Sequence, residues 1–276
     1  MTFREAVKKL ASAGIENARA DAALLFKRFA GVDAARLPLV YDENYDIPEL
    51  LDAVERRCAH TPIQYILGSW EFFGLDFYVC PDCLCPRPDT EISVETALSL
   101  LPNGADFLKL CTGSGCISVS LCKTRGDLSG IATDKFENTL AVAQKNAEKH
   151  GVADRLTLVC ADLFDAPDYV GERRFDAIIS NPPYIPTRDI DALSDEVKKE
   201  PIAALDGGDD GLDFYRHIVS EYTKYLKDGG KIIFEIGYDQ GDTLKNIAKS
   251  HGYICEIIKD LGKNDRVAVL RKAGVC

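Results

Sequence analysis

The sequence predicts an α/β fold: a doubly wound, mostly parallel sheet with an antiparallel edge strand, preceded by a small helical domain and a β-hairpin linker. From residue 106 onward, short apolar runs alternate with amphipathic stretches over about 165 residues, which is the pattern of consecutive strand–helix units. The last two apolar runs follow each other with no helix between them, so we expect them to pair antiparallel at the end of the sheet.

Residues 1–66 are predicted to form the helical domain. Thr2 and Glu5 have the spacing of a capping box, in which each residue accepts a hydrogen bond from the other's backbone N–H. Polar caps, prolines and glycines delimit three helices, which we expect from Thr2 to Gly14, from Asn17 to Gly31 and from Pro48 to about Cys58.

Residues 67–85 are predicted to be a linker, and residues 86–276 the domain that holds the sheet. The aromatic-rich run Pro62–Val79 is punctuated by Gly68 and Gly74, which favours a hairpin. After a helix from Asp89 to about Leu101, the expected strands are 106–111, 129–134, 155–160, 175–180, 230–236, 253–259 and 265–271, with helices near 115–124, 136–150, 213–226 and 239–250.

Composition limits the function classes. The chain has 276 residues, 46% of them hydrophobic, and a net charge of −11. No apolar run reaches the roughly 18 residues needed to cross a membrane, and the N-terminus has no signal-peptide pattern, so a cytoplasmic protein is expected. The first 85 residues carry nine Lys and Arg against thirteen Asp and Glu. Because nucleic-acid binders present a basic face, a small molecule or a basic protein is the more plausible ligand.

The ten cysteines are interpreted as free thiols of a reducing compartment. Five of them lie inside apolar segments, where a free Cys behaves as a small buried hydrophobe: Cys111, Cys116, Cys122, Cys160 and Cys255. Cys80, Cys83 and Cys85 form a cluster with one C-x2-C step. No second Cys or His pair follows at zinc-finger spacing, so no metal site is predicted.

A cofactor site is predicted at the ends of three successive strands. The loop after the first strand is rich in glycine, which lets a backbone approach a ligand closely, and comprises Cys111, Thr112, Gly113, Ser114 and Gly115. Asp134 ends the second strand and can accept both ribose hydroxyls, while Asp162 ends the third and can accept from an adenine amine. A dinucleotide fingerprint needs a third Gly where Ser118 stands. Combined with Asp134, Asp162 and the Asn-Pro-Pro-Tyr segment after the fourth strand, the loop fits S-adenosylmethionine better.

A tetrapeptide, Asn181-Pro182-Pro183-Tyr184, directly follows the fourth strand. Asn offers a side-chain carbonyl acceptor, prolines have no competing N–H, and Tyr offers a flat face for a planar group. This combination suits the NH2 of an amide or of a base amine. An ordinary Asn-Pro turn is the alternative interpretation.

At these residues the chain resembles the release factor glutamine methyltransferases, and the resemblance covers nearly its whole length. It is carried by Pro62–Phe77, Pro86–Glu91, the glycine loop, Asp162–Phe164, Asn181–Pro186, Glu200-Pro201 and Ala204–Tyr215. The family implies a class I methyltransferase (Rossmann-like) domain, S-adenosylmethionine as cofactor, and methylation of the N5 amide of the Gly-Gly-Gln glutamine in bacterial peptide chain release factors. Class I release factors are the implied partners, docked by residues 1–66; a monomer without direct nucleic-acid binding is expected.

Transferred by position, the resemblance assigns cofactor binding to Cys111–Gly115, Asp134, Asp162, Leu163 and Asn181. It assigns substrate binding to Asn181, Pro182, Pro183 and Tyr184, with Asn181, Pro182 and Tyr184 as the catalytic residues.

Lys109 departs from the family, which has an acidic residue at this position before the glycine loop. A lysine brings a like charge toward the cofactor's ammonium and sulfonium groups, so we expect its side chain to turn outward to solvent. Two alternatives stay open: a methyltransferase for adenine N6 or guanine N2 amines in nucleic acid, and a release-factor-binding protein whose catalysis Lys109 has weakened.

Overall fold

The computed structural model describes residues 1–165 and 167–274. The chain divides into two compact units. The first comprises Met1–Ser69 together with Leu193–Lys199, and the second comprises Trp70–Ala192 and Glu200 onward. The segment Leu193–Lys199 therefore belongs to the helical unit, although it lies within the sequence of the sheet-bearing unit. None of the helices in the described ranges is both long and apolar enough to span a bilayer.

The helical unit contains α1 (Phe3–Ser12), α2 (Ala18–Ala30), α3 (Pro48–Cys58) and α4 (Ile63–Leu67). The capping box at Thr2 is formed, with Glu5 N–H donating to Thr2 Oγ1 at 3.1 Å. Gly31 ends α2 in the left-handed conformation, as predicted. Asn17 precedes α2 but makes no side-chain capping hydrogen bond, so its expected capping role is wrong.

A buried guanidinium ties the two chain segments of the helical unit together. Arg57, on α3, is 5% exposed. Its Nε donates to Asp21 on α2 at 2.7 Å, and its Nη2 donates to Glu196 at 2.7 Å. These carboxylates raise the pKa of Arg57 against the desolvation that opposes its charge.

The predicted hairpin is formed, but by only part of the aromatic-rich run Pro62–Val79. Strands β1 (Ser69–Phe72) and β2 (Leu75–Tyr78) pair around a turn at Gly74, whose φ is 69°. The residues before them form α4 instead of a strand, because Gly68 adopts φ 73° and caps that short helix.

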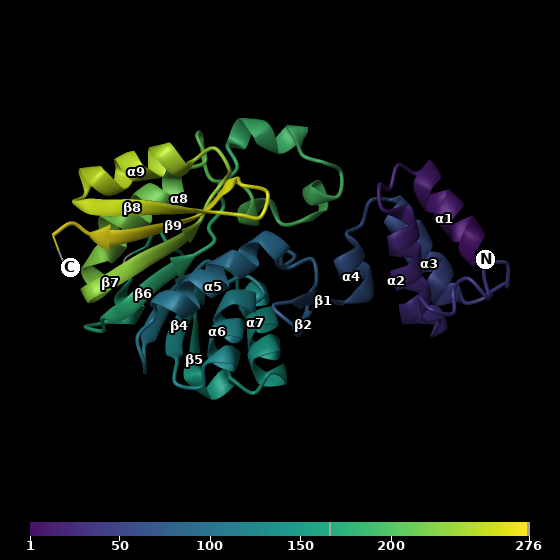
Figure 1. Cartoon of the computed structure of the whole chain (residues 1–276), viewed down its shortest axis with the longest axis horizontal. Coiled ribbons are helices and arrows are strands. Elements are labelled where there is room, and N and C mark those ends of the chain that lie inside the picture. Colours follow the sequence, from purple (N-terminus) through teal and green to yellow (C-terminus); the bar gives the residue numbers. More distant parts are fainter. Residues whose placement is uncertain (166, 275–276) are drawn as a thin grey trace. The chain divides into compact units, whose positions relative to one another are not determined.

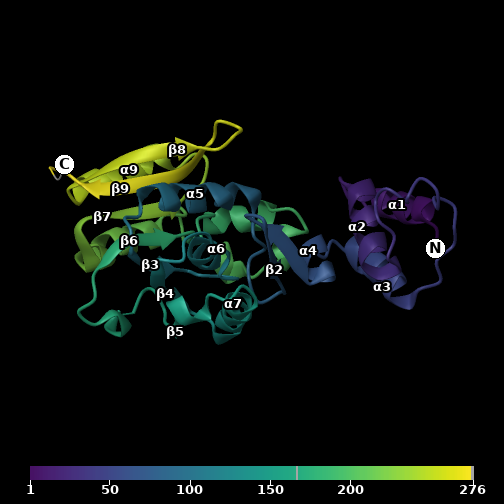
Figure 2. The same cartoon turned by 60° about the horizontal axis from the view of Figure 1, so that its bottom comes forward.

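The second unit is built on a seven-stranded sheet with all the predicted strands: β3 (Asp106–Leu110), β4 (Ser129–Asp134), β5 (Leu156–Cys160), β6 (Phe175–Ser180), β7 (Leu226–Glu235), β8 (Tyr253–Lys259) and β9 (Asp265–Lys272). Their order is β5-β4-β3-β6-β7-β9-β8, and Figure 2 shows it from β8 at the top to β5 at the bottom. Strands β3 to β7 pair in parallel, while β9 pairs antiparallel with β7 and β8. The predicted antiparallel edge is thus confirmed.

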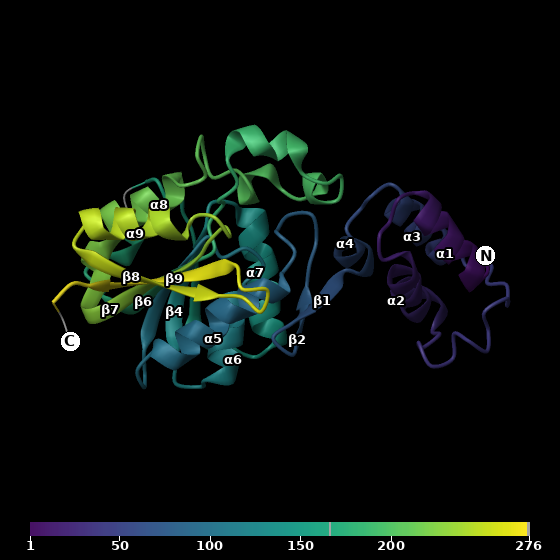
Figure 3. The same ribbon diagram turned by 45° about the horizontal axis from the view of Figure 1, so that its top comes forward.

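Helices cover both faces of this sheet (Figure 1). On one face, α5 (Glu91–Leu100), α6 (Cys116–Thr124) and α7 (Glu137–Lys149) contribute to a core cluster that includes Phe107, Ile179 and Ile233. Figure 3 shows α8 (Asp213–His217) and α9 (Gly241–Ser250) on the other face of the sheet. The core cluster on that face includes Leu108, Ile178 and Ile232. The alternation along each strand sends neighbouring side chains into opposite cores.

The helix predicted over 213–226 changes geometry along its length. After α8 it continues as a π turn (Ile218–Tyr222) and a 3-10 turn (Thr223–Tyr225). The wider turn buries Ile218, Val219 and Tyr222 together and lets the Tyr222 hydroxyl donate to the carbonyl of Leu163 at 2.9 Å.

Candidate functional site

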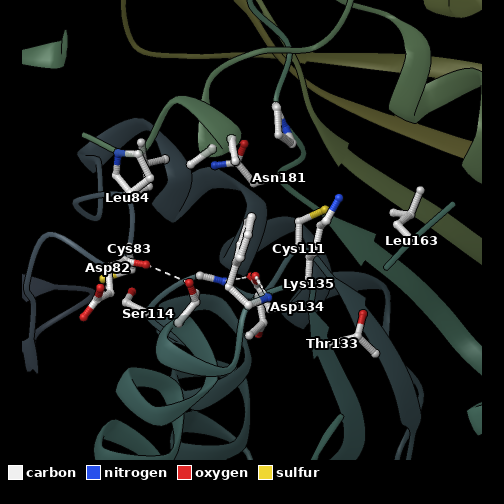
Figure 4. A pocket seen from close by; sticks show the side chains of 18 of the residues that line it. Asp82, Cys83, Leu84, Cys111, Ser114, Thr133, Asp134, Lys135, Leu163 and Asn181 are labelled. Carbon is white, nitrogen blue, oxygen red and sulfur yellow. Dashed lines mark hydrogen bonds between the residues drawn. The ribbon is translucent and has the colours of Figure 1, made fainter. Parts of the chain in front are cut away.

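A pocket of about 640 Å³ opens at the carboxyl ends of strands β3 to β6. It lies where the order of the sheet reverses, between β3 and β6, which is the position at which open α/β sheets bind ligands. Residues from the loops after these strands line it together with residues 81–87, residues 201–204 and Asp206, and Figure 4 shows part of this lining. Its volume is that of a site for one small organic molecule.

The glycine loop after β3 forms one wall. Cys111, Gly113 and Gly115 all have positive φ angles, of 53°, 57° and 80°. Gly115 does not line the pocket, and its lack of a side chain serves packing, since a Cβ there would lie 3.1 Å from that of Ala143 on α7. The predicted Cys111, Thr112, Gly113 and Ser114 do line the pocket.

Asp134, at the end of β4, is fixed by the loop that it faces. Its carboxylate accepts from the N–H of Gly113 at 2.9 Å and from that of Phe136 at 3.3 Å. Burial raises the pKa of Asp134, although these hydrogen bonds act in the opposite direction. Because each carboxylate oxygen keeps an acceptor position, Asp134 can bind a pair of hydroxyl groups in the pocket.

Asp162 and Leu163 follow β5 and also line the pocket. The Asp162 carboxylate pairs with Lys135 at 2.8 Å and accepts from Phe164 N–H at 3.0 Å, and the Lys135 hydrogen bond lowers the pKa of Asp162. Leu163 is 6% exposed and gives this end of the pocket an apolar surface.

Asn181 follows the last residue of β6 and lines the same pocket, as does Pro183. Its Nδ2 donates to Thr90 Oγ1 at 3.5 Å, and Thr90 lies just before α5. Pro182 and Tyr184 are absent from the lining that the described residues form. Tyr184 packs instead against the core on the α8 face, where burial raises its pKa to about 12.

Glycines of the Ala204–Tyr215 segment pack directly against the backbone of the Asn181–Tyr184 loop and so support it. The sequence did not predict this role. A Cβ at Gly207 would lie 2.8 Å from Pro183 O, and one at Gly211 would lie 2.3 Å from Tyr184 O. The side chain of Gln240 completes the support by donating to the carbonyls of Tyr184 at 3.0 Å and Gly211 at 3.2 Å. The repeated glycines of this segment were the sequence feature that could have indicated such close backbone packing.

Glu200 fixes a second part of the rim. This buried carboxylate accepts from Cys85 N–H at 3.1 Å and from the guanidinium of Arg87. It therefore fastens residues 85–87 to the segment that starts at Pro201, and both stretches line the pocket.

Lys109 does not turn outward, so that prediction is wrong. The residue is 1% exposed, and its Nζ donates to the carbonyls of Leu110 at 2.6 Å and Cys111 at 2.8 Å. Strand β3 is central and covered on both faces, which leaves its side chain no route to bulk water except the pocket that it lines. Desolvation lowers the pKa of Lys109.

Two residues of the cysteine cluster, Cys83 and Cys85, line the pocket. Cys83 and Cys85 are buried, and the Cys83 thiol donates to the carbonyl of Cys80 at 3.6 Å. Among residues 1–165 and 167–274, no group of three or more His, Cys, Asp or Glu side chains is arranged to hold a metal ion. Cys160, expected to be buried, is exposed because it ends the edge strand β5.

Two family models match the chain. One, described as the PrmC N-terminal domain, covers residues 2–68, and the other, the Methyltransferase small domain, covers residues 93–208. The release factor glutamine methyltransferase of Geobacter sulfurreducens is 43% identical over 94% of this chain and 91% of its own length. The enzyme of that name from Clostridium acetobutylicum is 40% identical over 87% of this chain and 87% of its own length. The one from Aquifex aeolicus is 36% identical over 98% of this chain and 95% of its own length.

Solved structures show the fold independently. A methyltransferase from Pyrococcus furiosus superposes with a TM-score of 0.55 at 21% identity, covering 72% of this chain and 89% of that one. The ribosomal protein L11 methylase of Lactobacillus delbrueckii subsp. bulgaricus gives 0.51 at 16% identity, over 70% and 84%. The class I methyltransferase fold predicted from the sequence is thereby confirmed.

Proposed function

Since this chain belongs to the release factor glutamine methyltransferase family, we propose that it transfers a methyl group from S-adenosylmethionine to the N5 amide of the glutamine in the Gly-Gly-Gln motif of class I peptide chain release factors. One observation carries the proposal: Asn181, at the end of β6, lines the same pocket as the glycine loop and Asp134. An amide-binding group thus stands beside a site suited to an adenosine-containing cofactor.

The pocket residues fit that cofactor. Asp134 offers carboxylate acceptors for two ribose hydroxyls, and Leu163 offers an apolar face for a base. Asp162 keeps acceptor capacity beside Leu163 for a base amine. The backbone of Cys111–Ser114 would lie along the methionine portion. When bound, S-adenosylmethionine supplies a methyl group on a positively charged sulfur.

The chain's own residues act mainly by positioning the target nitrogen. An amide nitrogen is a poor nucleophile because its lone pair is delocalised into the carbonyl. The Asn181 side-chain carbonyl would accept one N–H of the glutamine amide, and the Pro182 backbone carbonyl the other. As the nitrogen attacks, positive charge grows on its hydrogens, so both hydrogen bonds strengthen toward the transition state. Pro183, which lines the pocket, would complete the amide site, and the surplus proton leaves to water.

The helical unit would dock the release factor, in keeping with the match of residues 2–68 to the N-terminal domain of this family. Its acidic balance favours a protein partner over nucleic acid. We further propose that the protein works as a cytoplasmic monomer, with a methyltransferase domain over 86–276 and a linker over 67–85.

The test is methyl transfer from labelled cofactor to a purified release factor, compared with its Gly-Gly-Gln to Gly-Gly-Ala variant. We expect label only on the glutamine form. Equal labelling of both forms would overturn the substrate assignment. Duplex DNA and ribosomal RNA in parallel reactions provide the comparison with base amine methylation, and preferential labelling of either would favour that alternative.

A further inference from the structure

One buried side chain outside the pocket joins two segments of the second unit. Asn146, on α7, is fully buried. Its Nδ2 donates to the carbonyl of Ser114 at 2.9 Å and to that of Tyr78 at 3.0 Å. Its Oδ1 accepts from the N–H of Tyr78 at 2.8 Å. One amide therefore binds the last residue of β2 and the glycine loop at the same time.

These three hydrogen bonds fix both the orientation and the residue type at position 146. The two carbonyls need one donor each, and the NH2 group of an amide carries two hydrogens. In an extended strand the N–H and C=O of one residue point to the same side, so Asn146 pairs with Tyr78 as a neighbouring strand would. An ionised aspartate in place of Asn146 could not donate, and an alanine would leave all three backbone groups without this partner.

Other residues on the same side of α7 also contact the pocket walls. Thr139, Ala143 and Asn146 have the spacing that places residues on one face of a helix. A Cβ on Gly115 would lie 3.1 Å from the Cβ of Ala143, so the glycine loop packs directly on this face. The Thr139 hydroxyl donates to the carbonyl of Asp82 at 2.7 Å, and Asp82 lines the pocket. This face of α7 thus supports two walls of the pocket.

The glycine loop links the anchor to the carboxylate proposed to bind ribose. Ser114 is 2% exposed and lines the pocket beside Gly113, whose N–H donates to Asp134 at 2.9 Å. Because Ser114 stands between two glycines with positive φ angles, the loop backbone has wide conformational freedom and depends on outside contacts for its shape. The hydrogen bond from Asn146 is such a contact. A shift of the loop would therefore also disturb Asp134.

We propose that Asn146 is a positioning residue for the cofactor: it holds the glycine loop in the shape that binds S-adenosylmethionine, and it makes the β1–β2 hairpin part of that site and more than a linker. This inference rests on the proposed use of S-adenosylmethionine. Without the Asn146 amide, the binding shape would be one of several populated shapes of the loop, and the apparent Kd rises by the inverse of its population. The effect should appear in cofactor binding and not in the chemical step, since Asn181 stands on a different loop.

The cofactor should in turn stabilise the hairpin, because coupling between two sites is reciprocal. If the hairpin holds the loop through Asn146, a ligand that orders the loop must also order the hairpin. Tyr78 is absent from the lining of the pocket that the described residues form, so its N–H is not covered by a ligand in that pocket. Hydrogen exchange of the β2 amides, with and without cofactor, therefore reports on the link.

The experiment uses the full chain and compares Asn146→Ala and Asn146→Asp with Ala147→Gly as the control. Ala147 is the next residue on α7, is also buried, and belongs to the core cluster that packs on the sheet. Its replacement by glycine destabilises the helix without removing a side-chain hydrogen bond. All three variants should therefore have a lower Tm than the wild type.

Only the two Asn146 variants should weaken the binding of S-adenosylmethionine, with a calorimetric Kd about tenfold higher or more. Their kcat with a release factor at saturating cofactor should stay within about twofold of the wild type, the split expected when binding alone is lost. The cofactor should lower deuterium uptake over Leu75–Tyr78 in the wild type and in Ala147→Gly, and should not lower it in the Asn146 variants.

An unchanged Kd in Asn146→Ala, an equal rise in Ala147→Gly, or unchanged uptake in the wild-type hairpin would each overturn the inference. The wild type separates the two proposals. If it does not bind S-adenosylmethionine, the proposed function fails; if it binds and Asn146→Ala binds as tightly, the positioning role alone fails. If the Asn146 variants do not fold, protection of β2 by the cofactor in the wild type supports the inference, and its absence overturns it.

Discussion

Gly207 lies directly against the backbone of Tyr184: a Cβ on the glycine would be 2.7 Å from the Tyr184 Cα. A contact this short leaves no room for any side chain, and the atoms that would clash belong to a backbone that cannot swing aside. The position of the Asn181–Tyr184 loop therefore depends on a glycine more than twenty residues away in sequence.

Gly207→Ala should displace Pro183 and Tyr184 and lower kcat by roughly tenfold or more, because small misplacements of a reacting group are costly. Overpacking should also destabilise the fold by about 1–3 kcal/mol. Gly126→Ala is the matched control, since a Cβ there meets nothing within 4 Å and Gly126 has no positive φ. Methyl transfer and thermal unfolding of both variants check the prediction, and equal behaviour of the two would contradict it.

Asn181→Ala removes the acceptor proposed for the substrate amide. We expect kcat to fall by about 10²–10³, the effect of removing one preorganised hydrogen-bonding group from an active site. Cofactor binding should change little, because Asp134 and the glycine loop stay intact. Single-turnover methyl transfer and calorimetric titration of the cofactor measure the two quantities. Near-normal turnover would exclude the proposed role.

Asp134→Asn should weaken cofactor binding by about 10- to 100-fold, because hydrogen bonds to a charged acceptor are the strong ones. Asp162→Asn should weaken it less, since that carboxylate is already paired with Lys135.

In the wild type, the affinity for the cofactor should decline in acid, beginning above the usual pKa of an aspartate. Burial raises the pKa of Asp134, and the protonated carboxyl group is a poor acceptor for the ribose hydroxyls. Titration calorimetry of both variants, and of the wild type at several pH values, gives the order; a larger effect at Asp162 would contradict it.

Lys109 places a buried positive charge at the pocket, with the carbonyls of Leu110 and Cys111 as its partners. Lys109→Met should tighten cofactor binding by removing a like charge, and Lys109→Asp should tighten it further, by about tenfold relative to the wild type. Both variants should unfold at lower temperature, because two carbonyls lose their donor. Unchanged affinity in both variants would contradict the prediction and show that Lys109 exerts no net repulsion on the cofactor.

Arg57→Ala should destabilise the helical unit by about 3–5 kcal/mol, because it leaves Asp21 and Glu196 without their buried partner. Arg56→Ala, one residue earlier, is the control. Arg56 is half-exposed and lies 4.0 Å from Asp52, so its loss should change the stability by less than about 1 kcal/mol. Chemical denaturation followed by circular dichroism compares the two, and similar midpoints would contradict the prediction.

The sequence predicted the features that depend on hydrophobic periodicity and on the residues at strand ends. The seven strands, the antiparallel edge and the pocket position of Asn181 and Asp134 all follow from local patterns, because parallel strands bring their carboxyl ends to one edge. The prediction that Lys109 is exposed to solvent was wrong, because its exposure depends on the position of its strand in the sheet. A local sequence pattern does not show which strand is central. Thr90 comes from a distant segment, and only the folded domain brings its hydroxyl to Asn181.

The segment Leu193–Lys199 also sets an order of events during synthesis. Glu196 reaches the ribosome exit well after the first helices, yet it is one of the two carboxylates that bind Arg57. Until then the guanidinium lacks one of its two carboxylate partners, and the helical unit lacks part of its own chain. The N-terminal unit is thus the first to emerge but cannot be completed until residue 199 has been made, and no single cleavage of the polypeptide can release it whole.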